Sequence, residues 1–245
     1  MKVLVCVSNV PDTTTKVTFT NDNMEFNTAG VQFIINPYDE IALARAIELT
    51  EDGKGTVTIV NVGKADTEPT IRKALAIGAD DAVRIDATPS DAYFVSYNIA
   101  EYARDKNFDL ILTGRESIDY NGAQVAAMVG EFLDIPSFSI IKKVEFDGSM
   151  ATVDREVEGG KEIINVSTPF VAGCAEGVAA ARIPNMRGIM SARTKRLEVI
   201  AALDSGQSTR IIKYDVPAQR STVKIIPAND VGKLVELLHS EAKVI

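Results

Sequence analysis

Short, mostly apolar segments alternate, in the first half of the chain, with longer segments in which apolar residues recur every three or four positions. The short segments are residues 3–7, 56–62, 82–85 and 110–113, and the first of them is continuously apolar. A continuous apolar run of this length is typical of a strand that is buried on both faces of a sheet. Strands that alternate with helices predict βαβ units with right-handed crossovers. We therefore expect an α/β fold with a mostly parallel sheet and flanking helices.

Capping and turn residues mark the ends of the expected helices. Asn36 is expected to cap the first helix, with Pro37 in its first position and acidic residues in its first turn. Gly78 is expected to end the second helix, and Ser90 is expected to cap the third. The helices are expected over about 37–49, 66–77, 90–106 and 122–133.

The periodicity changes after Pro136. Two turn sequences, Asp147-Gly148 and Gly159-Gly160, separate apolar runs in this region, and both pairs favour tight hairpins. They predict an antiparallel hairpin addition to the parallel sheet from about residue 137. An earlier polar stretch around residues 21–30 predicts another hairpin-like excursion. The strands after Pro136 are expected at 142–146, 150–157 and 161–166, with one more at 170–174.

The chain loses clear alternation from about residue 175. The remainder contains Pro184, Pro217 and Pro227, and a short helix is expected near residues 230–240. So little apolar surface does not suffice for a separate core. We therefore expect an α/β domain over 1–175 and an extended C-terminal arm within 176–245. The arm either packs on another subunit or folds back on its own domain, and the pattern favours neither.

The composition excludes several classes of function. Of the 245 residues, 46% are hydrophobic and 24% charged, as in ordinary globular proteins, and the net charge is −8. Nonspecific nucleic-acid binding needs a basic surface and is therefore not expected. No run approaches the roughly 20 apolar residues of a membrane span, and the apolar run at the N-terminus is too short for a signal peptide. We expect no membrane span and a cytoplasmic location.

The rare residues limit catalysis. One histidine, His239, and two cysteines, Cys6 and Cys174, are all that the chain offers to a Ser-His-Asp triad, a Cys-His pair or a typical zinc site. The cysteines lie far apart in sequence, which does not indicate a disulfide framework. We expect both cysteines to be structural and His239 to lie on the surface. With no catalytic residue and no metal site expected, binding of a cofactor or partner is favoured.

Ligands of open parallel sheets bind at the carboxyl ends of the strands, over the amino ends of helices. Loops of this kind follow Val7, Val62 and Thr113. The third loop, residues 114–125, places glycines, a hydroxyl and an amide between a strand and a helix. Helical N–H groups there would bind a phosphate, and Gly122 would allow close approach of the backbone. The alternative is an ordinary capped loop, because neither GxGxxG nor GxxxxGK[ST] is present.

Two other segments carry candidate chemistry. Residues 36–39 are expected either to close over the same ligand or only to cap a helix. Residues 182–196 contain five basic residues and no acidic one, together with Met186, Ile189 and Met190. Flexible apolar side chains ringed by cations suit docking to an acidic partner. The alternative is a solvated charge run beside core methionines.

Several stretches together resemble the β subunit of electron transfer flavoprotein, also called the FixA type. The resemblance covers nearly the whole chain and depends on the ordered combination of stretches rather than on one motif. The matching stretches are residues 3–7 with Pro11 and Asp12, 36–40, 71–80, 114–125, 153–160 and 189–200.

The resemblance implies a nucleotide-binding domain of the adenine nucleotide α-hydrolase-like kind, in a heterodimer with an α subunit. It implies an electron carrier rather than an enzyme. FAD, held mostly by the α subunit, would pass electrons from an acyl-CoA or related dehydrogenase to a quinone reductase or another acceptor. The β subunit would hold AMP or, as in electron-bifurcating members, a second FAD. Gln124-Val125 resembles the bifurcating group, and both nucleotides stay open.

Carried over position by position, the resemblance also implies roles for individual residues. A partner-recognition loop at about 182–196 would dock the dehydrogenase, and the C-terminal arm would embrace the α subunit. The docking residues would be Arg182, Met186, Ile189 and Arg193. The nucleotide contacts would be Cys6, Asn36, Pro37, Tyr38, Asp39, Val62, Gly114, Arg115, Glu116, Ser117, Ile118, Asp119, Tyr120, Asn121, Gly122, Ala123, Gln124 and Val125.

Two other functions are compatible with the pattern. A stand-alone nucleotide-binding regulator of the universal stress protein type uses a similar α/β sheet, but the antiparallel addition and the long arm suggest a permanent partner instead. A hydrolase or transferase that uses the 114–125 loop is less favoured, because nothing pairs with Asp119 as a nucleophile or base.

Overall fold

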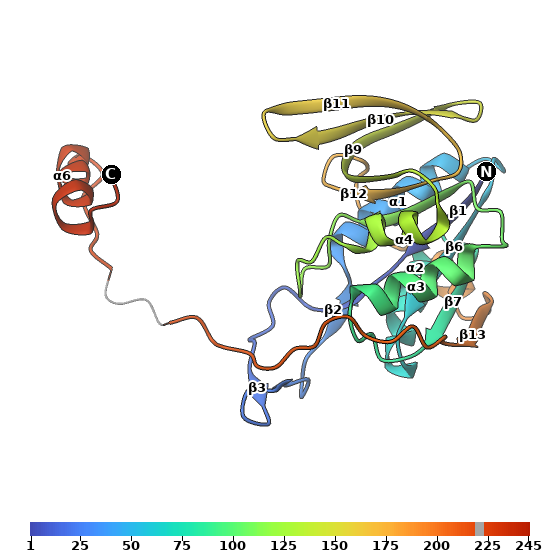
Figure 1. Ribbon diagram of the computed structural model, residues 1–245, viewed down its shortest axis with the longest axis horizontal. Helices are drawn as coiled ribbons and strands as arrows, with labels where there is room; N and C mark the ends of the chain where they lie inside the picture. The colour runs from blue at the N-terminus through green and yellow to red at the C-terminus, as the bar shows by residue number, and fades with distance from the viewer. Residues whose placement is uncertain (219–222) are drawn as a thin grey trace.

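The computed structural model describes residues 1–218 and 223–245. In this part of the chain, nine strands form one large sheet that is flanked by helices (Figure 1). The expected α/β fold is therefore confirmed. Across the sheet the strands are β11 (Gly160–Ser167), β10 (Met150–Val157), β9 (Ser137–Asp147), β12 (Phe170–Cys174), β8 (Leu110–Gly114), β1 (Lys2–Cys6), β6 (Thr56–Val62), β7 (Asp81–Asp86) and β13 (Leu197–Ala201).

Most of the sheet is parallel. Each neighbouring pair from β9 through β12, β8, β1, β6 and β7 to β13 is parallel. The strands β9, β10 and β11 pair antiparallel, as the two hairpin turns predict. In β1, Val3, Leu4 and Val5 are all completely buried. Burial on both faces favours an apolar residue at every position, which is why the run at residues 3–7 is unbroken.

Helices cover both faces of the sheet. Val5 belongs to a core cluster with Leu43 of α1 and with residues of α2, whereas Leu4 packs with Ile99 of α3 and Val129 of α4. Successive strand residues point to opposite faces, so α1 and α2 cover one face and α3 and α4 the other. The helices are α1 (Pro37–Thr50), α2 (Glu68–Ile77, preceded by the 3₁₀ turn η1, Ala65–Thr67), α3 (Ala92–Ala103) and α4 (Val125–Leu133).

Two helix starts differ in detail from the expectation. The cap of α3 is Asp91 rather than Ser90, and its carboxylate accepts a 2.8 Å hydrogen bond from the N–H of Phe94. A carboxylate caps well and its charge also complements the helix dipole. Asn36 occupies the N-cap position of α1 with Pro37 next to it, but its side chain makes no capping hydrogen bond. The Asn36 side chain is used elsewhere, in the candidate site.

Between β1 and α1 the chain makes the expected hairpin-like excursion. Asn21, Asp22 and Asn23 form its turn with φ angles of 51°, 53° and 63°, a left-handed conformation that Asn and Asp tolerate better than most residues. The pairs of short strands are β2 (Asn9–Pro11) with β5 (Phe33–Ile35) and β3 (Phe19–Thr20) with β4 (Glu25–Phe26).

The C-terminal segment has a part that packs on the domain and a part that leaves it. Helix α5 (Met186–Ala192) packs on α2, and β13 pairs with β7, so the sheet continues beyond residue 175. Helix α6 (Val231–Leu237) and the π-helical turn η2 (Leu238–Ala242) have no buried residue and stand apart from the domain (Figure 1). In residues 1–218 and 223–245, none of the helices is long and apolar enough to cross a membrane.

Candidate functional site

A cleft of about 980 Å³ opens at the carboxyl edge of the parallel strands. The loops that follow Val7, Val62 and Thr113 all line it, because neighbouring parallel strands end at the same edge of a sheet. The excursion between β1 and α1 forms another wall. The volume lies at the upper end of the range, roughly 300–1,000 Å³, of small-molecule sites.

Most of the residues expected to contact a ligand line this cleft. The residues expected but not found in its lining are Asn36, Pro37, Tyr38 and Asn121. The expected residues that line it are Cys6, Asp39, Val62, Gly114, Arg115, Glu116, Ser117, Ile118, Asp119, Tyr120, Gly122, Ala123, Gln124 and Val125.

Asn36 supports the 114–125 loop from behind. Its side-chain amide donates a 2.8 Å hydrogen bond to the carbonyl of Glu116, and its side-chain oxygen accepts one of 3.2 Å from the N–H of Ile118. Asn36 is completely buried, so these bonds satisfy groups that water cannot reach. Beside it, the ring of Tyr38 lies 5.4 Å from the guanidinium of Arg115, a cation–π contact. Residues 36–39 therefore brace the loop.

Asp39 joins two strand ends. One carboxylate oxygen accepts a 2.7 Å hydrogen bond from the N–H of Ser8, after β1, and the other accepts one of 2.8 Å from the N–H of Gly114, at the end of β8. The side chain is 3% exposed. Burial raises the pKa of Asp39 to about 6, against hydrogen bonds from Ser8, Asn36 and Gly114 that lower it. The carboxylate is thus ionised at neutral pH, as a double acceptor must be.

The two cysteines are buried, free thiols near this carboxylate. Burial, followed by the negative charge of Asp39, raises the pKa of both Cys6 and Cys174 well above the ordinary value. A protonated, buried thiol is a poor nucleophile. The structural role expected of Cys174 agrees with its complete burial, whereas Cys6 also forms part of the cleft wall.

The helix after the 114–125 loop begins later than expected. Helix α4 begins at Val125 rather than at Gly122, because Asn121 and Ala123 both have φ near 51°, which a right-handed helix excludes. Gly122 lines the cleft, and a Cβ added there would meet nothing closer than the side-chain oxygen of Gln124 at 4.0 Å. The protein itself therefore leaves room at Gly122. The first-turn N–H groups of α4 come directly after this glycine segment. They lack intrahelical partners and are free to bind an anion.

The cleft has a polar and an apolar part. The polar part contains the 114–125 loop with Arg115, and Lys64 at the end of β6. Val17, Phe19 and Phe26, from the excursion, provide apolar surface. A pocket with polar groups at one side and aromatic side chains at another suits a ligand that combines phosphate with a flat ring.

Sequence reasoning missed several lining residues. The sequence analysis points to the loops after Val7 and Val62 without naming their lining residues. Those after β7 could have been found, because they follow a strand end as Gly114 does. Nothing in the sequence indicated the residues beyond β13. The missed residues are Val7–Asn9, Pro11–Thr13, Thr15, Val17, Phe19, Phe26, Thr28, Phe33, Val60, Gly63, Lys64, Asp66, Thr67, Thr88–Ala92, Val95, Ile99, Thr113, Thr209–Ile211 and Tyr214.

The basic stretch 182–196 contains cations that contact the domain and cations that face solvent. Arg182 forms an ion pair with Glu51 of α1's C-terminal end. The ammonium of Lys195 donates to the carbonyls of Leu75 and Ala79 at 3.0 and 2.6 Å, which satisfies the end of α2. Arg193 is exposed. The structure thus commits part of this stretch to holding α5 and its flanks on the domain.

The apolar residues of α5 face solvent. Met186 is 74% exposed, and Ile189 and Met190 are exposed as well. Core methionines are therefore excluded as the explanation of this pattern. A Cβ on Gly188 would overlap the carbonyl oxygen of Ala76, so glycine permits the close packing of α5 on α2 that presents these side chains.

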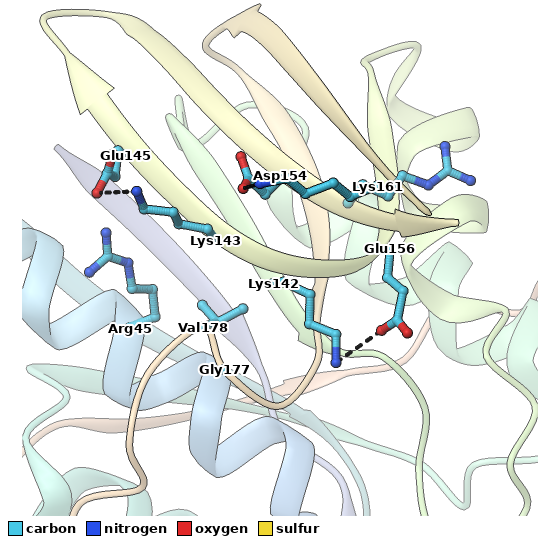
Figure 2. Close-up of a pocket in the computed structure, with 10 residues that line it drawn as sticks. Arg45, Lys142, Lys143, Glu145, Asp154, Glu156, Lys161, Gly177 and Val178 are labelled. Atoms are coloured by element: carbon cyan, nitrogen blue, oxygen red, sulfur yellow. Dashed lines mark hydrogen bonds and ion pairs between the residues drawn. The ribbon is translucent and has the colours of Figure 1, made fainter. Parts of the chain in front are cut away.

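A second hollow, of about 480 Å³, lies between α1 and the antiparallel strands. Figure 2 shows its charged side chains, among them three lysines that pair with carboxylates. The ion pairs are Lys142–Glu156 at 2.9 Å, Lys143–Glu145 at 2.9 Å and Lys161–Asp154 at 3.0 Å. Charges that are already neutralised pairwise offer little to an ionic ligand.

An α/β domain whose parallel strands end in a cleft, over a glycine-containing loop and a helix start, belongs to the class of open α/β sheet proteins, which bind ligands at this edge of the sheet. Residues 23–205 match the family model described as the electron transfer flavoprotein domain. This chain belongs to the family of electron transfer flavoprotein β subunits.

Curated relatives match over nearly their whole length. The chain is 36% identical to "Electron transfer flavoprotein subunit beta" of Bacillus subtilis (strain 168), with 100% of both chains covered. It is 34% identical to the protein of that name from Syntrophomonas wolfei subsp. wolfei, covering 100% of this chain and 98% of the relative. It is 32% identical to the one from Homo sapiens, covering 97% and 98%.

Proposed function

We propose that this β subunit binds a nucleotide, AMP or a second FAD, in the cleft at the carboxyl edge of its sheet. The observation that carries the proposal is the 114–125 loop, which Asn36 and Asp39 hold in place through hydrogen bonds. Gly122 leaves room for a ligand next to the backbone. The amino end of α4 offers N–H groups and a positive dipole end to a phosphate.

The chain forms a heterodimer with an electron transfer flavoprotein α subunit, which shares FAD with it. When bound, FAD supplies the redox chemistry, and the protein supplies position and electrostatics. This division of labour agrees with a chain that has one exposed histidine and two unreactive thiols. In this role the protein is an electron carrier in the cytoplasm and not an enzyme.

Electrons come from an acyl-CoA or related dehydrogenase and go to a quinone reductase or another acceptor. The dehydrogenase docks on the exposed face of α5, where Met186 and Ile189 provide apolar contact and Arg193 positive charge. Exposed, flexible apolar side chains within a basic stretch suit an acidic partner. Arg182, paired with Glu51, supports the start of this loop.

The decisive experiment is to coexpress this chain with its α subunit, purify the complex, and quantify the FAD and AMP that denaturation releases. One FAD and one AMP per heterodimer support the proposal and identify a carrier with a single flavin. Two FAD and no AMP support it and identify a bifurcating protein. A chain that forms no complex, carries no flavin and binds ATP as a homodimer contradicts it and favours the regulator.

A further inference from the structure

The chain crosses the mouth of the cleft after it has left the sheet. Residues 203–214, which we call the strap, follow β13, and Thr209, Arg210, Ile211 and Tyr214 within them line the cleft. In Figure 1 the strap runs from β13 past α3 to β3 before the chain continues toward α6. The strap is therefore the part of the site that adjoins the C-terminal arm.

The first half of the strap is attached to α3. The Leu203 backbone both donates to and accepts from the side chain of Asn98, at 2.7 and 3.1 Å. One oxygen of Asp91 accepts hydrogen bonds from the N–H groups of Ser208 and Thr209 at 2.7 and 2.8 Å. Desolvation raises the pKa of Asp91. These two hydrogen bonds, together with the one from the N–H of Phe94, outweigh desolvation and hold the pKa below its ordinary value.

The second half of the strap is attached to two other walls of the cleft. The ring of Tyr214 stacks on that of Phe19 with centroids 4.7 Å apart, and its N–H donates to the carbonyl of Asn23 at 2.7 Å. Its hydroxyl lies 3.3 Å from that of Tyr120, in the 114–125 loop. One side chain thus connects the strap, the excursion and the 114–125 loop at the rim of the cleft.

We propose that the strap covers the nucleotide and slows its release from the cleft. This inference rests on the proposed nucleotide site. Thr209, Arg210, Ile211 and Tyr214 line the cleft, so a ligand that fills it contacts the strap. A ligand that leaves past these residues first has to break the strap's hydrogen bonds to Asp91 and Asn23 and the stacking of Tyr214 on Phe19.

The test is the variant Tyr214→Ala in the purified heterodimer, compared with Ile212→Ala. Ile212 is 73% exposed, belongs to the same strap and does not line the cleft. We expect Tyr214→Ala to release its nucleotide about two- to tenfold faster, the effect of losing one stacked aromatic pair. Ile212→Ala is expected to release it at the wild-type rate. Equal rates of nucleotide release from the wild type and Tyr214→Ala would overturn the proposed role of the strap.

A measurement on the wild type avoids any folding defect of a variant. Trypsin can cut the strap at Arg210 and Lys213, and mass spectrometry identifies the fragments. We expect cleavage of the nucleotide-free heterodimer at these residues to slow at least about tenfold when the nucleotide found in the purified protein is added back. An unchanged cleavage rate contradicts the proposed role of the strap but not the nucleotide site. A wild-type heterodimer that contains no β-subunit nucleotide contradicts the proposed site itself.

Discussion

Asp39 and Gly114 approach each other so closely that only glycine fits at residue 114. The N–H of Gly114 donates a 2.8 Å hydrogen bond to the carboxylate of Asp39, and a Cβ on residue 114 would overlap that same carboxylate and the Cβ of Tyr38. This contact attaches the start of the 114–125 loop to the start of α1. Gly114 therefore serves the protein's own packing, whereas Gly122 faces open space.

The first prediction concerns this contact. Gly114→Ala is expected to destabilise the protein by about 1–3 kcal/mol, the usual cost of overpacking, and to reduce nucleotide content because the loop loses its anchor. Denaturant unfolding and nucleotide quantification measure both effects. The control is Gly173→Ala, on the neighbouring strand, where a Cβ makes ordinary contacts at 3.6 Å. Equal stability of the two variants would contradict the argument.

The second prediction separates ligand contact from packing. Gly122→Val is expected to abolish nucleotide retention, because its side chain would occupy the space in which a ligand approaches the backbone. Stability should change little, since no protein atom lies near the added Cβ. Nucleotide content after purification is the measurement. Gly160→Val, at another open glycine outside the cleft, is the control. Wild-type nucleotide content in Gly122→Val would remove this loop from the site.

The third prediction is a pH dependence from Asp39. Its pKa is about 6 in the folded protein against an ordinary value of 3.8, so the folded state binds the proton more tightly. The contribution of Asp39 to stability is therefore greatest below about pH 4 and decreases as the pH rises toward 6, by about 3 kcal/mol in total.

Unfolding experiments on the wild type and on Asp39→Asn, from pH 4 to 7, test this sign. The difference in unfolding free energy between them should shift in favour of the variant as the pH rises through this window. The comparison cancels the other titrating groups. A carboxyl resonance of Asp39 that titrates below pH 4 in an NMR experiment would show that burial does not dominate.

The fourth prediction concerns the docking surface. Met186→Ala is expected to slow electron transfer from the dehydrogenase severalfold while flavin content stays unchanged, because the exposed side chain touches nothing that holds the cofactor. Stopped-flow reduction of the flavin measures the rate. Met150→Ala, at an exposed methionine on β10, is the matched control. Equal rates for the wild type and Met186→Ala would contradict docking through α5.

Much of the site was accessible to sequence reasoning. The 114–125 loop could be identified because it follows a buried strand and precedes a helix, and parallel strands must end at one edge. The strap was not accessible, since Tyr214 lies in a stretch without periodicity and reaches the cleft through Phe19 and Tyr120. The strand β13 was missed for a related reason: Val199 is exposed, so an edge strand lacks the apolar pattern of the central strand β1.

The sequence by itself determined the layers of this protein and the edge at which its cleft opens. Burial on both faces leaves an unbroken apolar run such as residues 3–7, and this local signal needs no knowledge of distant partners. Only the tertiary structure decided where the polar side chains act. The side chain of Asn36 bonds to Glu116, 80 positions away, and Lys195 satisfies the end of α2. A hydrogen bond needs two groups within about 3 Å, and the fold alone brings such groups together.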